Sequence, residues 1–495
     1  MPRPDMPRFF AATLALFLAT GAGAAAVSPR AIPETVSVKE LQARIATLAD
    51  DKFQGRQPGT RGGLRTEAYV AKAFARAKLA PGAAGGGWRQ TITLVRRTPV
   101  TAAFRLGPVG IGADQLALTG RGGSEGLDGA PVFFVGAALP EQIADTDLHG
   151  AIVLLASELP GGGHGLGDRE EALRAAGAAA ILIIPAADAD WPAFAAEQGG
   201  RARLPDFGAR IEGAIARPAA ARLAQFTGQS FDALLTAAGG AGFRPLRLPG
   251  GATLSAETRV APFQTANIVG KVAGSDPAAG AVVLSAHWDH LGAQCRPEGA
   301  PDRICNGAVD NASGTAMLIE IARRVAAGPR PRRDVYFLAT TSEELGLLGA
   351  RAFADAPPVP LGRVVANLNI DTAAIAPAGM PVAIMGRGRT PALDTAIDAA
   401  IRKAGRQLDS DNEADIMLKR QDGWAFGEKG VPAVMVSGSF SDMNKLMAYL
   451  RANYHGPLDD VAHLPPLDGA AEDATLHVAL ARALADPALY PSPRR

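Results

Sequence analysis

The sequence predicts an α/β fold in which a mostly parallel sheet, flanked by helices, is interrupted by a β-rich inserted domain. Three apolar runs, at 281–286, 335–339 and 364–370, have the length and composition of strands buried on both faces, as in a parallel sheet covered by helices. From residue 265 onward, helical patterns alternate with such runs. Between about 110 and 248 the chain instead has many glycines and short strand-like runs, which indicates a separate domain.

The composition is that of a folded protein large enough for several domains. Of 495 residues, 47% are apolar and 20% are charged, and the formal net charge is +1. This balance excludes a disordered chain and gives no basic surface of the kind that binds nucleic acid. Nothing in the composition indicates an oligomeric state.

The first residues have the pattern of a secretory signal peptide. Arg3 and Arg8 precede an apolar run at 9–19, and small residues follow up to Ala26, so we expect cleavage after Ala24 or Ala26. An anchoring helix is the alternative, but the run is shorter than the roughly 20 residues that span a bilayer. We therefore expect a periplasmic or secreted protein with no membrane anchor after cleavage.

Export bears on the two cysteines of the chain. Cys295 and Cys305 flank a short polar stretch, and in an oxidising compartment a close pair is usually bridged. Two free thiols are the alternative, and metal ligation is a weaker one because nearby acids and histidines already suit a metal. We expect a disulfide.

The remaining elements follow from local patterns. Four regions are expected in order: 1–26 the signal peptide, 27–109 the first part of the main domain, 110–248 the insertion, and 249–495 the rest of the main domain. Apolar residues at helical spacing predict helices at 38–48, 66–79, 169–176, 312–326, 390–404 and 473–484. Further strands are expected at 88–94, 132–135, 151–155, 180–184 and 431–436.

Metal-binding side chains follow three of the predicted strands. His287 ends the first run, the pair Glu343 and Glu344 follows the second, and Asp371 ends the third. In an open α/β sheet, ligands bind in the crevice beyond the carboxyl ends of the strands. One histidine and three acids at that edge indicate a metal-dependent hydrolase.

Zinc in a catalytic site takes imidazole and carboxylate ligands, and a zinc pair needs one bridging carboxylate. Asp310, in a loop of small residues that opens a helix, is the candidate bridge. One of the adjacent Glu343 and Glu344 is expected to coordinate and the other to act as general base. Asp289 is placed to hold the second ring nitrogen of His287. Asp371 and His455 complete two coordination spheres.

Five short motifs together resemble a known family, the di-zinc exopeptidases of the bacterial aminopeptidase and aminopeptidase Y type. In order and spacing they match it over about residues 262–485, and the stretch 53–56 is similar to its N-terminal segment. The insertion resembles a protease-associated domain. The motifs are His287–Gly292, Asn306–Gly314, Ser342–Gly349, Asn369–Asp371 and Tyr454–Asp459.

The resemblance implies a zinc-exopeptidase-like fold, two zinc ions and peptide substrates. It places His287 and Asp371 on one ion and Glu344 and His455 on the other, with Asp310 between them. It makes Glu343 the general base that activates the attacking water, and Tyr454 a group that polarises the scissile carbonyl. Departures from the family pattern at Thr372, Gln421 and Gly456 concern the substrate pocket rather than the metals.

The activity expected is that of an aminopeptidase, because Glu343 and Asp371 lie where the family binds the substrate's α-ammonium group. A carboxypeptidase or dipeptidase on the same scaffold stays open, since Lys419 or Arg420 could be aimed at a terminal carboxylate. A glutaminyl cyclase-like acyltransferase would need one zinc, and an inactive binding homologue would be expected to lack ligands. His290 and His463 are expected to form local hydrogen bonds.

Overall fold

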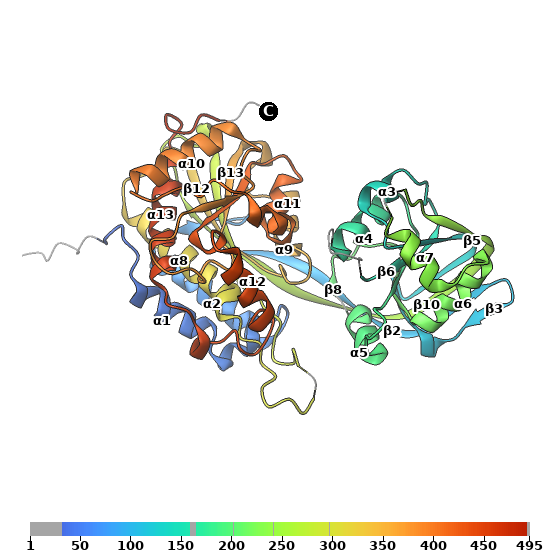
Figure 1. Cartoon of the computed structure of the whole chain (residues 1–495). Helices are drawn as coiled ribbons and strands as arrows, with labels where there is room; N and C mark the ends of the chain where they lie inside the picture. Colours follow the sequence, from blue (N-terminus) through green and yellow to red (C-terminus); the bar gives the residue numbers. More distant parts are fainter. Residues whose placement is uncertain (1–31, 159–164, 201, 241, 297, 493–495) are drawn as a thin grey trace, which may run out of the picture.

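The computed structural model describes residues 32–158, 165–200, 202–240, 242–296 and 298–492. The chain forms two lobes joined by a pair of long antiparallel strands (Figure 1). These strands are β2 (Arg89–Leu106) and β10 (Leu246–Val272), and each contributes to the sheets of both lobes. We call residues 99–257 the second lobe and the remainder the main lobe. The expected signal peptide lies outside the described residues.

The main lobe is built on a mixed, mostly parallel sheet. Its strands run in the order β14-β15-β13-β11-β12-β10; β15, β13, β11 and β12 are parallel, while β14 and β10 are antiparallel to their neighbours. Every residue of the two central strands β11 and β12 is buried, which explains their uninterrupted apolar sequences. The strands are β1 (Ala80–Pro81), β11 (Ala281–His287), β12 (Asp334–Thr340), β13 (Val364–Asn369), β14 (Ala383–Met385) and β15 (Ala433–Ser437).

Helices cover both faces of this sheet (Figure 1). One face packs in a large apolar core with α1, α2, α8, α10 and α13, and the other packs in a smaller core with α9 and α11. The expected helices are present, with ends shifted by up to five residues. The helices are α1 (Val38–Leu48), α2 (Arg61–Arg76), α8 (Gly314–Ala327), α9 (Leu348–Asp355), α10 (Pro391–Lys403), α11 (Gly423–Gly427), α12 (Met443–Ala452) and α13 (Asp468–Leu484).

The second lobe has its own apolar cores and its own sheet. Strands β5, β6, β7 and β9 are parallel, with β4 antiparallel at the edge. The strands are β3 (Val109–Ile111), β4 (Leu116–Gly120), β5 (Ser124–Gly136), β6 (Ile152–Ala156), β7 (Ala180–Ile184), β8 (Ala202–Arg203) and β9 (Ile211–Ile215). The helices are α3 (Pro140–Ala144), α4 (Leu166–Ala175), α5 (Trp191–Gly199), α6 (Arg217–Ala224) and α7 (Phe231–Ala238).

This lobe differs from the sequence-based expectation in two ways. Its described residues form more helices than the single one expected. Helices α5, α6 and α7 are only eight or nine residues long, so each gives little more than two turns of pattern in the sequence. Its boundaries also lie outside 110 and 248. Its core includes residues from Ala102 to Ala256, since β2 and β10 run through both lobes without a break that the sequence would mark.

Short helical turns connect many of these elements. Three of them frame the site described below: η1 precedes α2, η5 leads into α8, and η7 precedes α11. The turns are η1 (Asp51–Arg56), η2 (Ala113–Gln115), η3 (Gln225–Thr227), η4 (Pro277–Ala279), η5 (Ala308–Ser313), η6 (Leu361–Arg363), η7 (Glu413–Arg420), η8 (Gly438–Phe440) and η9 (Val461–His463).

Candidate metal centre

Three neighbouring strands end at one point of the main lobe. In the register of β11 with β12, His287 lies opposite Thr340, and in that of β11 with β13, Ser285 lies opposite Asn369. The residues that follow β12 and β13, namely Glu343, Glu344 and Asp371, are therefore delivered to the edge where β11 ends in His287. The loop of Asp310 and the end of α12, which leads to His455, complete the group.

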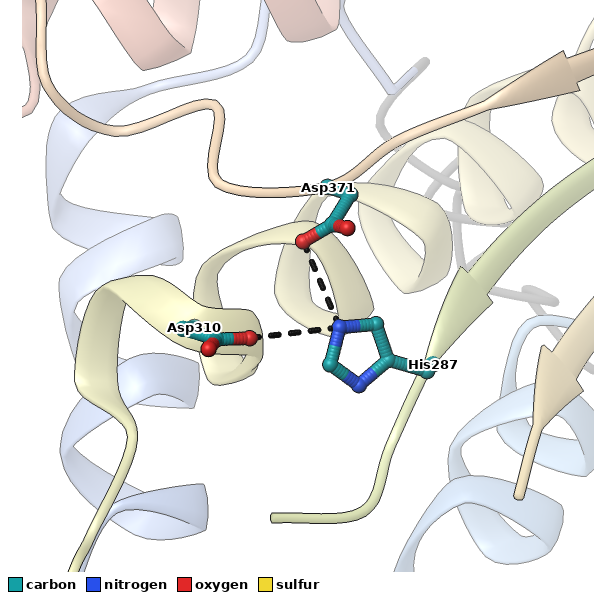
Figure 2. A group of neighbouring side chains, drawn as sticks. All are labelled: His287, Asp310 and Asp371. Atoms are coloured by element: carbon teal, nitrogen blue, oxygen red, sulfur yellow. Dashed lines mark hydrogen bonds and ion pairs between the residues drawn. The ribbon is translucent and has the colours of Figure 1, made fainter. Parts of the chain in front are cut away.

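His287, Asp310 and Asp371 converge on one point (Figure 2). The Nε2 atom of His287 lies 3.2 Å from Oδ1 of Asp310 and 3.3 Å from Oδ1 of Asp371. All three side chains are largely withdrawn from solvent, with exposed fractions of 1%, 3% and 11% respectively. The side chains come from two strand ends and the η5 loop, so the fold itself brings them together.

Asp310 presents its other oxygen to a second group. Its Oδ2 lies 3.3 Å from Nε2 of His455, and that nitrogen lies 2.8 Å from Oε2 of Glu344. The two carboxylate oxygens of Asp310 thus face two different histidines, as a carboxylate shared between two ions requires. The structure brings together all five residues expected as metal ligands.

The donor set and its spacing fit zinc. With zinc–ligand bonds of about 2.0–2.2 Å, neighbouring ligand atoms of a tetrahedral site are about 3.3 Å apart, close to the separations around Asp310. The buried atoms Oδ2 of Asp310 and Nε2 of His455 lie close to each other, but among the described residues neither has a partner that is placed for a hydrogen bond. Such atoms are costly to bury unless another group satisfies them. The residues present therefore fit a metal ion.

Asp289 acts differently from the expectation. Its carboxylate oxygen Oδ1 is 3.9 Å from Nδ1 of His287, too far for a hydrogen bond, and the backbone carbonyl of Asp289 lies closer, at 3.2 Å. Oδ1 instead accepts a hydrogen bond from the backbone N–H of Glu343, at 3.2 Å. Strand β11 ends at His287, and two residues later the carboxylate of Asp289 faces the end of the neighbouring strand, where it positions Glu343 rather than the imidazole ring.

The charges of the site shift the pKa values of its members. Burial, together with the charges of Asp371 and Glu344, holds the pKa of Glu343 well above its usual range. Burial alone would lower the pKa of His455, but the nearby carboxylates of Asp310 and Glu344 raise it to about 10. Burial also raises the pKa of Asp289 to about 7. Without bound cations, the excess of acids is thus offset by retained protons, which metal binding would release.

Two positioning residues cannot be identified from the sequence. The Arg56 side chain is fully buried and donates hydrogen bonds to four backbone carbonyls: those of Leu48, Trp288, Asn306 and Gly307. From the other side, the Asp459 carboxylate accepts the N–H groups of Val309 and Asp310. The loop that carries Asp310 is therefore held at both ends. In the sequence, Arg56 belongs to the stretch 53–56 and Asp459 ends the motif Tyr454–Asp459, but neither pattern indicates that the side chain holds the loop of Asp310.

Tyr454 stacks on the ring of His455, with centroids 3.7 Å apart and planes at 18°. Burial raises its pKa well above the usual value, so the phenol stays protonated. Ser342, Thr372 and His455 have positive φ angles of 57°, 50° and 56°, in the left-handed region that costs a residue with a side chain free energy. Ser342 precedes Glu343, Thr372 follows Asp371, and His455 is itself an expected ligand. The backbone is therefore strained next to the residues of the metal centre.

Cys295 and Cys305 form a disulfide, with Cα atoms 5.9 Å apart. The bridge closes the loop between His287 and Asp310. Sγ of Cys305 lies 3.6 Å from the backbone carbonyl of His455, so the bridged loop borders the centre.

Part of the chain is similar to known proteins. Residues 267–479 match the family model described as Peptidase family M28. A vacuolar membrane protease of Lachancea thermotolerans is 36% identical over 114 residues, which are 23% of this chain and 11% of that protein. The probable glutamate carboxypeptidase LAMP1 of Arabidopsis thaliana is 30% identical over 191 residues, 38% of this chain and 24% of that protein. The matches thus span no more than a quarter of these relatives.

A solved structure shares the fold. The aminopeptidase from Aneurinibacillus sp. strain AM-1 aligns over 93% of this chain and 97% of its own, with a TM-score of 0.53 and 16% identity. At that identity the likeness concerns the fold alone, and it confirms the mixed α/β architecture expected from the sequence.

The expected periplasmic or secreted location is wrong by the same comparisons, because curated relatives that match are vacuolar membrane proteases of yeasts. Within the described residues, no helix has both the length and the apolar character needed to cross a membrane. All the metal-type residues of the centre lie inside the matched segment. Residues 267–479, which contain these side chains, are thus similar to peptidase family M28.

Proposed function

We propose that the chain is a zinc-dependent exopeptidase that removes N-terminal residues from peptides. The observation that carries this proposal is the placement of two histidine–acid pairs around the two oxygens of Asp310. His287 and Asp371 lie on one side, and Glu344 and His455 on the other. The first set would hold one ion and the second set another, with Asp310 shared. The match of residues 267–479 to a peptidase family supports the reaction type.

A bound zinc ion would supply Lewis acidity toward the substrate carbonyl. Glu343 would act as general base and then as general acid. Its carboxylate would take a proton from the attacking water and pass it to the departing amine nitrogen. The hydrogen bond from its backbone N–H to Asp289 fixes the start of this turn. The phenol of Tyr454, held by stacking on His455, would donate to the carbonyl oxygen as negative charge develops there.

The charge of the site supports attack at the amino end. A free α-ammonium group needs carboxylates as partners, and Glu343 and Asp371 provide them beside the proposed ions. A carboxypeptidase would need a cation aimed at the terminal carboxylate. Lys419 lies 3.2 Å from Asp168 of the second lobe, so it is already paired. Arg420 is exposed and keeps a carboxypeptidase as the second candidate, which the name of the Arabidopsis relative also favours.

Substrates with free and blocked ends separate the two candidates. Aminoacyl anilides with a free amine should be cleaved, and their N-acetylated forms should not. Elemental analysis of the same preparation should give about two zinc ions per chain, as a paired site requires, and a chelator should abolish activity. Cleavage of N-blocked dipeptides, with no action on the free-amine anilides, would replace the aminopeptidase by the carboxypeptidase. An active preparation with one ion or none would overturn the paired-zinc centre.

We further infer that the second lobe is an accessory domain, as its likeness to protease-associated domains suggests. It has a separate apolar core, and the clusters of potential metal ligands found among the described residues all lie in the main lobe. The lobe therefore bears on how substrates reach the site rather than on the chemistry.

A further inference from the structure

His290 is a third histidine at the centre, and neither proposed coordination sphere needs it. It lies three residues beyond His287, and its side chain is fully buried. Its Nδ1 atom is 2.6 Å from Oε1 of Glu344 and 3.8 Å from Oδ2 of Asp310. The first distance is that of a strong hydrogen bond and the second is too long for one. His290 therefore contacts one ligand carboxylate directly.

The contact divides the two oxygens of Glu344 between two histidines. Oε1 faces Nδ1 of His290, and Oε2 faces Nε2 of His455. A carboxylate oxygen only accepts, so Nδ1 must carry the proton. Nε2 of His290 has no hydrogen-bond partner among the described residues, so the ring is held through Nδ1. An imidazole that coordinated a metal through Nδ1 could not donate this hydrogen bond at the same time.

The surroundings of His290 leave its ring little freedom. A Cβ atom placed on Gly307 would lie 2.6 Å from Cγ and Cδ2 of His290, so the ring packs directly against the backbone of the loop that leads to Asp310. On another side its ring meets that of His455 edge-on, with centroids 5.7 Å apart. The glycine at 307 thus has a packing reason, and the donor at Nδ1 is aimed at Glu344.

We propose that His290 is a positioning residue for Glu344. By donating to Oε1 it stops the carboxylate from rotating and leaves Oε2 as the oxygen presented to the ion shared with His455 and Asp310. Hydrogen-bonding partners of ligand carboxylates tune metal affinity in this way. The inference rests on the proposed zinc centre, and it makes the two proposed ion sites unequal, because only one is supported by a third histidine.

Stepwise zinc binding, measured by competition with a chromogenic chelator, tests the role of His290. His290→Ala should weaken the binding of one of two ions by about 10–100-fold and leave the other unchanged, as for other hydrogen-bonding partners of ligands. His290→Asn should recover most of the affinity, because its amide nitrogen stands at the place of Nδ1 and can donate. His463→Ala removes another histidine–carboxylate pair, 2.6 Å long and exposed, and should change nothing.

A double-variant cycle separates this role from a general effect on folding. If His290 acts through Glu344, adding His290→Ala to Glu344→Gln should have little further effect on zinc affinity. Full additivity in that cycle, or equal losses in the Ala and Asn variants, would overturn the proposal. Unchanged affinity in His290→Ala would do the same. A wild-type protein that binds no zinc would instead overturn the proposed function, so the two failures are distinguishable.

Discussion

The two lobes bury different kinds of side chain. In the main lobe, His287, His290 and several acids of the centre are withdrawn from solvent around the ends of β11, β12 and β13. In the described part of the second lobe, the buried charged side chains are Arg169 and Glu170, and Arg169 donates to the carbonyls at the end of β6. Burying ionisable groups costs free energy unless they are paired or bind a metal, and such groups cluster at functional sites. The difference supports our proposal that the chemistry belongs to the main lobe.

The proposal that the main lobe carries the chemistry is tested most directly at Glu343. Glu343→Gln should lower turnover by about 10²–10⁴-fold, the usual contribution of a positioned acid–base group, with fold and metal content unchanged. Steady-state kinetics and elemental analysis of one preparation measure both. Glu344→Gln is the matched variant, and it should weaken metal binding. If the two phenotypes are exchanged, the base and the ligand have been assigned the wrong way round.

The two histidines expected as metal ligands differ in burial, and this difference should appear in the stability of their variants. His287 is 1% exposed and His455 is 35% exposed. His287→Ala should remove the imidazole that lies against Oδ1 of both Asp310 and Asp371 in a closed site, and cost about 1–3 kcal/mol in the unfolding free energy of the metal-free protein. His455→Ala should cost less, because water can replace the ring. Urea unfolding of both apo variants makes the comparison, and equal costs would refute the difference in burial.

These residues also mark how much of the site can be predicted from a sequence. His287, Glu344 and Asp371 follow apolar runs, so the ends of the predicted strands are enough to place them near each other. Arg56 has no such pattern around it, because its partners are backbone carbonyls contributed by segments up to 251 positions away. The role of Asp289 depends on which way its carboxylate faces beyond the end of β11, and the sequence does not determine this. In the second lobe, α6 and α7 have only eight residues each, which is little more than two turns over which a helical period can be recognised.

Removing the Arg56 side chain, which holds the loop of Asp310, should have a smaller effect on the main lobe. Arg56→Met removes four hydrogen bonds to backbone carbonyls, and we expect zinc affinity to fall by about 10–100-fold. Because Arg56 contacts the segments of both His287 and Asp310, both ions should be affected, unlike in His290→Ala. Arg65→Met, an exposed arginine on α2, is the control. Loss of thermal stability with unchanged zinc affinity would reduce Arg56 to a purely structural role.

The smallest effect is expected where the two lobes meet. Lys419 of η7 lies 3.2 Å from Asp168 of α4, with both side chains partly exposed, and Lys419 also lies 5.3 Å from the ring centre of Trp424. Exposed ion pairs contribute about 0.2–1 kcal/mol, and salt screens them. Lys419→Ala should therefore lower the unfolding free energy by no more than about 1 kcal/mol at low salt, and by less at high salt.

Zinc content and cleavage of single-residue anilides should not change in Lys419→Ala, because the lysine faces the second lobe. Urea unfolding at two ionic strengths measures the effect on stability, with Lys429→Ala as a second exposed pair inside the main lobe. A marked loss of anilide cleavage in Lys419→Ala alone would show that this cation serves the substrate after all. The chemistry would then no longer belong to the main lobe by itself, since the partner of that cation is Asp168 of the second lobe.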